Sequence, residues 1–210
     1  NYGYDFAVGD NVTVGTMTLG DIALDVGQSG TISAEFSHTA AADDGVATVG
    51  DLTMGNFDAT LAQAAYGDLE LDHYAYSPGP GGAVVGASTI GDTTLDLATD
   101  ASFYASIDIS AYSTGGDATV GDVVIGSITV AQGVNSDVEL DYYVEADAAA
   151  ARVAQVGSVT VGDLTVDAND GATFSYTFSI DAYGTTADIG NVQFGNVQLA
   201  GGVSASMDLY

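Results

Sequence analysis

The stretch "VGSVTVGDLTV", residues 156–166, states one five-residue phrase twice, first from Gly157 and then from Gly162. Within each phrase the two apolar residues lie two positions apart, so they share one face of an extended strand. The second glycine and the residue after it reset this alternation, and a reset needs a bend. Glycine suits a bend because it accepts a positive φ, and an Asp, Asn, Ser or Thr after it can hydrogen-bond to the local backbone. The stretch therefore predicts short flat sides joined at glycine corners.

The double phrase recurs along the whole chain. Its six copies begin near residues 14, 49, 85, 120, 156 and 189, and their first glycines are spaced 35, 36, 35, 36 and 33 residues apart. A fixed period of this length is typical of an array built from one supersecondary unit. We therefore predict a single repeat domain over residues 1–210. The predicted corner glycines are Gly15, Gly20, Gly50, Gly55, Gly86, Gly91, Gly121, Gly126, Gly157, Gly162, Gly190 and Gly195.

Each unit continues into a second segment that alternates apolar and polar residues, as in 102–113, 137–148 and 172–184. This period of two predicts half-buried strands and an all-β chain. Sides and corners that recur every ~35 residues favour a β-solenoid, whose successive coils stack at the spacing of strands. An antiparallel β-sandwich or barrel is the alternative. Odd units carry Ser- and Thr-rich second segments and even units carry "DLELDHY" or "DVELDYY", so the chain also divides into three units of ~70 residues.

Aspartate occupies alternate corners in successive units. It stands at the second corner of units one, three and five and at the first corner of units two and four, so in a parallel stack no corner aspartate lies directly over another, as avoidance of like charges requires. Turn formation and solubility explain these residues. The functional alternative is calcium, which prefers carboxylate oxygens, although the chain has neither an EF-hand loop nor the nonapeptide calcium repeat. The candidate calcium ligands are Asp21, Asp51, Asp92, Asp122 and Asp163.

The charge of the chain is strongly one-sided, with 29 acidic residues against a single basic one, Arg152, and a formal net charge of -28. Nucleic acid and anionic lipid are therefore excluded as partners, because binding to phosphates needs Lys or Arg. No apolar run reaches the ~18 residues of a membrane helix, so we predict no membrane-spanning segment. The absence of Cys does not identify the compartment, but a single Arg and no Lys leave almost nothing for a trypsin-like protease, and Asn11–Thr13 form a glycosylation sequon. We expect an extracellular or cell-surface protein in its mature form; a cytosolic protein of a salt-loving organism is the alternative.

No catalytic constellation is present, so we predict that the protein is not an enzyme and has no certain cofactor. The only two histidines, His38 and His73, each lie 23 residues after the first glycine of their unit. The next three units hold Ile109, Val144 and Ile180 at that position. We therefore expect a buried histidine pair, in adjacent coils and within about 10 Å if the coils stack in parallel. Two histidines alone lack the third ligand usual for zinc.

Two rows of surface residues suggest a binding function. Tyrosines recur late in the second segment, and amphipathic rings are common in interfaces and in sugar-binding surfaces alike. A row of outward threonines could order water and bind ice or a crystalline surface, although the β-propensity of Thr explains it equally well. The tyrosines are Tyr76, Tyr112, Tyr143 and Tyr183, and the threonines are Thr18, Thr53, Thr89 and Thr160, interrupted by Val124 and Gln193.

The two ends of the chain are strand-like and aromatic, "NYGYDF" and "VSASMDLY", whereas repeat proteins need polar caps to stay monomeric. We therefore expect a structural subunit of an extracellular filament, sheath or surface layer that forms a homopolymer. The alternatives are a monomeric surface-binding module, such as an adhesin or a carbohydrate- or ice-binding protein, and an outer-membrane β-barrel, which the glycine corners disfavour. The predicted assembly interface comprises Tyr2, Tyr4, Phe6, Met207, Leu209 and Tyr210.

Overall fold

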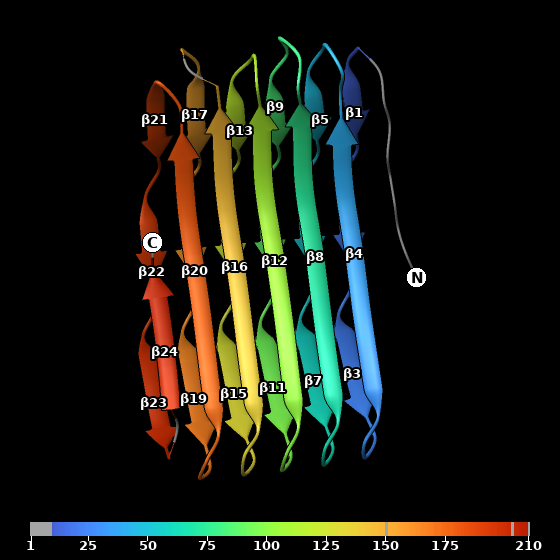
Figure 1. Cartoon of the computed structure of the whole chain (residues 1–210), viewed down its shortest axis with the longest axis vertical. Helices are drawn as coiled ribbons and strands as arrows, with labels where there is room; N and C mark the ends of the chain where they lie inside the picture. The colour runs from blue at the N-terminus through green and yellow to red at the C-terminus, as the bar shows by residue number, and fades with distance from the viewer. Residues whose placement is uncertain (1–9, 150, 203, 210) are drawn as a thin grey trace.

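The computed structural model describes residues 10–149, 151–202 and 204–209. Within these ranges the protein is all-β and has no helix. The chain winds through six coils of four strands each, and equivalent strands of successive coils pair to form four six-stranded sheets, as Figure 1 shows. Every pairing among the described strands is parallel, for example Val12–Val14 with Ala47–Val49. The protein is therefore a β-solenoid, and the antiparallel alternatives are wrong.

Three of the sheets are built from the short sides that the double phrase predicts. Sheet A contains β1 (Val12–Val14), β5 (Ala47–Val49), β9 (Ala83–Val85), β13 (Ala118–Val120), β17 (Val153–Val156) and β21 (Thr186–Ile189). Sheet B contains β2 (Met17–Leu19), β6 (Leu52–Met54), β10 (Ser88–Ile90), β14 (Val123–Ile125), β18 (Val159–Val161) and β22 (Val192–Phe194). Sheet C contains β3 (Ile22–Val26), β7 (Phe57–Leu61), β11 (Thr93–Leu97), β15 (Ile128–Gln132), β19 (Leu164–Ala168) and β23 (Val197–Gly201).

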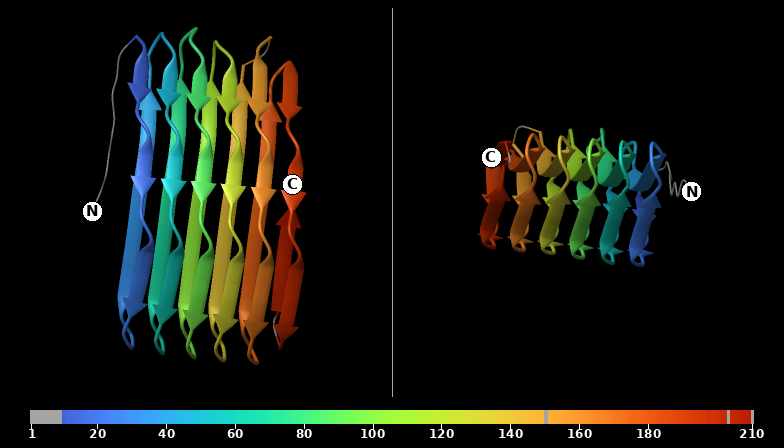
Figure 2. Two further views of the ribbon diagram at one scale, coloured as in Figure 1. Left: turned by 180° about the vertical axis from the view of Figure 1, so that it is seen from behind. Right: turned by 90° about the horizontal axis from the view of Figure 1, so that it is seen from below.

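The second segment of each unit forms one long strand. Sheet D contains β4 (Thr31–Ala41), β8 (Tyr66–Ser77), β12 (Ser102–Ser113), β16 (Asp137–Ala148), β20 (Thr173–Tyr183) and β24 (Ser204–Leu209). Sheets A, B and C follow one another along one side of the molecule, and sheet D covers the opposite side (Figure 2). The solenoid is therefore flattened, with two broad faces and a first and a last coil at its ends.

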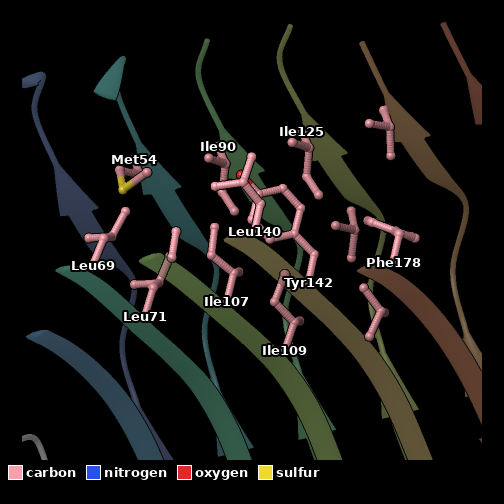
Figure 3. Close-up of a cluster of buried hydrophobic side chains, with 14 of the residues drawn as sticks. Met54, Leu69, Leu71, Ile90, Ile107, Ile109, Ile125, Leu140, Tyr142 and Phe178 are labelled. Atoms are coloured by element: carbon pink, nitrogen blue, oxygen red, sulfur yellow. The ribbon is translucent and has the colours of Figure 1, made fainter. Parts of the chain in front are cut away.

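The core lies between these two sides. One row of sheet D runs Leu71, Ile107, Tyr142 and Phe178 in register across four coils, and all four side chains are buried. Figure 3 shows this row facing side chains of sheet B, namely Met54, Ile90 and Ile125. The alternation within each phrase thus places its apolar pair inward, and the Gly-x step restores that phase after every short strand.

The corner glycines are at the predicted places, between sheets A and B and between sheets B and C, but their role differs from the predicted one. Among the described glycines only Gly171 and Gly201 have a positive φ. At Gly121 an added Cβ would lie 2.8 Å from the backbone nitrogen of Ala87 and 2.8 Å from the carbonyl carbon of Gly86, both in the preceding coil. The corners therefore need glycine because successive backbones approach closely there.

A positive φ instead occurs at the turn from sheet C to sheet D. Four of its residues are not glycine, namely Ser29, Ala64, Asp100 and Asn135, with φ between 53° and 59°. Coil five has Gly171 in this turn, at φ 77°. Asn and Asp tolerate this left-handed conformation better than Ala does, because their side chains can hydrogen-bond locally.

We expect Ala64→Gly to raise the free energy of unfolding by about 1 kcal/mol, because it removes the clash between Cβ and the backbone at φ 55°. Urea unfolding of the two proteins measures the difference. The matched control is Gly171→Ala, which should destabilise the same turn one coil from the C-terminal end. Equal stabilities for Ala64→Gly and the parent chain would contradict the strain assigned to this turn.

Candidate assembly surface

The five candidate calcium ligands stand apart from one another in two corner rows. In the second corner row Asp21, Asp92 and Asp163 are separated by Asn56 and Ser127, and in the first corner row Ala87 separates Asp51 from Asp122, so no corner aspartate lies over another. Within the described ranges no group of three His, Cys, Asp or Glu side chains could hold a metal ion. Calcium binding at these residues stays a prediction.

Each corner aspartate hydrogen-bonds to the backbone of the next coil. Its Oδ1 accepts a hydrogen bond from a backbone N–H one coil further on, for example at 2.8 Å from Asn56 to Asp21 and at 2.9 Å from Ala87 to Asp51. Asp92, Asp122 and Asp163 accept in the same way from Ser127, Ser158 and Asn196. A neutral amide can replace the carboxylate, since Oδ1 of Asn56 accepts from the N–H of Asp92 at 3.1 Å. These corners therefore form ladders of hydrogen bonds along the solenoid.

The two histidines lie in adjacent coils, as predicted. His38 pairs in register with His73, and their rings stack with centroids 5.0 Å apart and planes 8° from parallel. His73 is fully buried, and its Nε2 donates to the carbonyl of Gly50 at 2.8 Å, which leaves Nδ1 to accept from the Ser88 hydroxyl at 2.7 Å. Burial lowers the pKa of His73 to about 4, so the ring is neutral at pH 7. The pair belongs to the core.

Acidic residues do stack on one another on the outer face of sheet D. Glu35 pairs with Glu70 and Asp72 with Asp108 in register, although like charges directly opposite are unfavourable. Partial burial and then the neighbouring charges of Glu70, Asp108 and Glu35 raise the pKa of Asp72 to about 6. Burial likewise raises the pKa of Asp108 and of Glu145. Like charges therefore repel one another on the outer face of sheet D, whereas the corner rows contain no such pairs.

We expect Asp72→Asn to stabilise the fold by about 1 kcal/mol at pH 7.5, after the pKa shift is discounted for solvent screening at this half-buried site. Because the pKa is raised on folding, Asp72 contributes stability below its unfolded pKa of 3.8 and loses it as the pH rises through about 6. The gain should therefore shrink at pH 4.5, as measured by urea unfolding. Asp58→Asn, an equal charge change between Ala23 and Thr94 on sheet C, is the control. A gain that is the same at both pH values would contradict the proposed repulsion.

The surface rows are in register as the repeat predicts. The exposed middle residues of sheet B run Thr18, Thr53, Thr89, Val124, Thr160 and Gln193. On sheet D, Tyr112 stacks on Tyr76 at 5.4 Å between ring centroids, and Tyr76 on Tyr74 at 6.3 Å. Tyr183 lies in the same row, but Asp147 separates it from Tyr112, and Tyr143 lies in another row; both are exposed. The tyrosines thus form one short stack instead of a continuous row.

Both ends of the solenoid leave apolar positions uncovered. The last coil exposes 46 % of Val192 and 42 % of Met207, although the equivalent residues of coil four, Val123 and Leu140, are buried. In the first coil Met17, Leu19 and Phe36 are only partly buried. An apolar groove of about 120 Å³ opens at the last coil, lined by Leu164, Phe174, Val197, Leu199, Ala205, Ser206 and Met207.

The predicted interface residues fall partly on this end. Met207 pairs with Tyr176 and Leu209 with Phe178 in sheet D. Tyr2, Tyr4, Phe6 and Tyr210 lie outside the described residues. The prediction missed four neutral amides of the last coil, Asn191, Gln193, Asn196 and Gln198, which an alignment of the six units would have revealed, because Asn fills both corners in this coil alone.

The sequence matches no protein-family model, and the chain has no match among curated proteins or solved structures. In the part of the chain that the structure describes, no helix is long and apolar enough to cross a membrane.

Proposed function

We propose that the protein is a structural subunit of an extracellular filament, sheath or surface layer and that it assembles with copies of itself. The observation that carries this proposal is the open state of both ends. Among the strands that the structure describes, β21, β22 and β23 at one end and β1, β2 and β3 at the other have a strand neighbour on one side only. An unpaired strand edge is a template for pairing with another chain.

The distribution of charge favours assembly through the ends over assembly through the faces. The broad face of sheet D carries stacked acids such as Glu35, Glu70, Asp72 and Asp108, and the chain as a whole has a net charge of -28. Two such faces repel one another, whereas the ends present apolar residues and free backbone groups. Contacts between two different ends of a chain are head-to-tail, and when they continue along the solenoid axis they produce open filaments.

The scarcity of protease cleavage sites favours an extracellular location. Arg152, the single basic residue of the chain, is the one cleavage site for a trypsin-like protease. A regular solenoid with hydrogen-bonded corners has few exposed irregular segments for other proteases. The proposal needs no cofactor and no nucleic-acid or membrane partner.

Assembly of the intact chain tests the proposal. Sedimentation velocity and negative-stain electron microscopy over rising protein concentration, with and without calcium, should show filaments or sheets. A chain that stays monomeric at high concentration in both conditions would contradict the structural function.

We expect Met207→Asp to leave the solenoid folded and to abolish assembly, because it places a charge among half-exposed apolar residues of the last coil. Circular dichroism checks the fold and sedimentation velocity the assembly. Thr160→Asp adds the same charge on the exposed face of sheet B and is the control, which should assemble. Normal assembly of Met207→Asp would remove the last coil from the interface.

A monomeric surface-binding module is the second candidate, and the flat row of Thr18, Thr53 and Thr89 favours it. A module of this kind would stay monomeric and would bind its surface through sheet B. Replacing these threonines with lysine would then abolish binding to ice or to a polysaccharide, while the same variant would still form filaments if the structural function holds.

A further inference from the structure

We infer that the last coil of one copy stacks in parallel on the first coil of the next copy, in the register that the six internal coils already use. This inference rests on the proposed function and names its interface. The partner is a second copy of this chain, placed so that Val192 lies beside Met17 and Gln193 beside Thr18, since these residues occupy the same rows of sheet B.

The corner ladder supports this register. Asn196 uses its backbone N–H and its Nδ2 on Oδ1 of Asp163, at 2.7 and 3.1 Å, which leaves its own Oδ1 as an acceptor. In the same corner row the Oδ1 of Asn56 accepts from the N–H of Asp92 in the next coil. Asp21 is the first residue of this row, so its N–H in the next copy would meet Asn196 in the same way. The amide between Asp163 and Asp21 keeps the two carboxylates apart.

The charge on the last coil is low. The described part of coil six has two acidic residues, Asp188 and Asp208, whereas coil four has Asp122, Asp137, Glu139, Asp141, Glu145 and Asp147. The other outward positions of the last coil hold uncharged residues, including the amides Gln193 and Gln198. In the proposed register Gln193 meets Thr18 and Asp188 meets Thr13, so neither adds a like-charge contact. Asp208 meets Glu35, a like-charge pair of the kind that sheet D already contains at Glu35 and Glu70.

The core rows are complementary in size across the junction. One row of sheet D begins with the small Ala34 and ends with the large Met207, running Ala34, Leu69, Ala105, Leu140, Tyr176 and Met207. Ala34 of the next copy would follow Met207, so a small residue would meet a large one at the junction.

The neighbouring row begins at Ile32 and ends at Ala205. Ile32 of the next copy would therefore lie over Ala205, which lines the apolar groove of the last coil. The branched side chain of Ile32 would thus fill the groove of the last coil, and its burial there would remove apolar surface from water.

The corner glycines provide the test. An added Cβ at Gly15 or Gly20 has no atom within 4 Å in the single chain, but at Gly50 it would lie 2.8 Å from the backbone of Gly15 in the preceding coil. In the proposed register the first coil of one copy would meet Gly190 and Gly195 of the other copy with the same close approach. Gly15→Ala/Gly20→Ala should therefore leave the melting temperature unchanged and raise the concentration needed for half-assembly at least tenfold. Thr13→Ala, on the exposed face of the same coil, is the control and should assemble normally.

Cross-linking fixes the register, because the chain has no Cys of its own. Gln193→Cys mixed with Thr18→Cys should give disulfide-linked dimers on oxidation, since directly opposite residues of paired strands lie within the range of a disulfide. Gln193→Cys alone should give none. Dimers from Gln193→Cys alone would show that the ends meet last coil to last coil and would overturn the register.

The outcomes separate the two proposals. Filaments that still form from the alanine pair, or that give no cross-link in the mixture, overturn this junction and leave the structural function standing. A parent chain without any assembly overturns both.

Discussion

Gly121→Ala is expected to destabilise the solenoid by about 4 kcal/mol, within the range of severe overpacking, and to leave little folded protein at 37 °C. The new Cβ would lie 2.8 Å from two backbone atoms of the preceding coil, and backbone atoms in a paired strand cannot move aside. Coils three and four would have to separate at this corner, which also stretches the hydrogen bond from the N–H of Gly121 to the carbonyl of Val85, 2.9 Å long in the parent chain.

Gly15→Ala is the matched control for this prediction. Gly15 occupies the same corner row in the first described coil, and no atom lies within 4 Å of its added Cβ. Its free energy of unfolding should change by less than about 1 kcal/mol. Thermal and urea unfolding by circular dichroism measure both variants, and equal stabilities would refute the close-approach explanation of the corners.

His73→Ile is expected to destabilise the fold by about 2 kcal/mol at pH 7.5, because the buried hydroxyl of Ser88 loses its partner. One coil further on, Ile109 takes the place of His73 and Val123 takes the place of Ser88, so an apolar pair already fills the equivalent positions there. The double variant His73→Ile/Ser88→Val should therefore recover most of the loss. Urea unfolding of both single variants and of the double variant gives the coupling.

The double variant His73→Ile/Ser88→Val should also change how the free energy of unfolding depends on pH below pH 6.5. Because the folded pKa of His73 is lowered to about 4, the parent chain keeps the stability of the neutral ring above pH 6.5 and loses it as the pH falls towards 4. The double variant should lack this loss, so its stability relative to the parent chain should rise over that interval. A constant difference between pH 7 and pH 4 would show that protonation of His73 does not limit the fold.

The repeat was enough to predict the coils, the inward phase of each phrase and the histidine stack. These features depend on spacing along the chain, and a solenoid converts a fixed spacing directly into neighbours in space. The alternation of corner aspartates followed from the same logic. The pairing of His73 with Ser88 could not be predicted, because it crosses the core between sheets D and B, and no spacing fixes which inward residues face each other there.

The role of the corner glycines was also beyond the sequence. Glycine at a bend fits both a positive φ and a close approach of two backbones, and composition does not separate them. The stacked acids Glu35 and Glu70, and Asp72 and Asp108, show a further gap. Avoidance of like charges holds at the corners but gives way on sheet D, where the apolar inward residues fix the register.

The subunit repeat along an assembled filament tests the account most directly. If six coils of one copy continue into six coils of the next at the strand spacing of about 4.8 Å, cryo-electron microscopy of the filaments should give an axial rise of about 29 Å per subunit, with a strong reflection near 4.8 Å along the filament axis. Filaments in which the 4.8 Å spacing lies across the axis, or a chain that forms no filament, would contradict assembly through the ends of the solenoid.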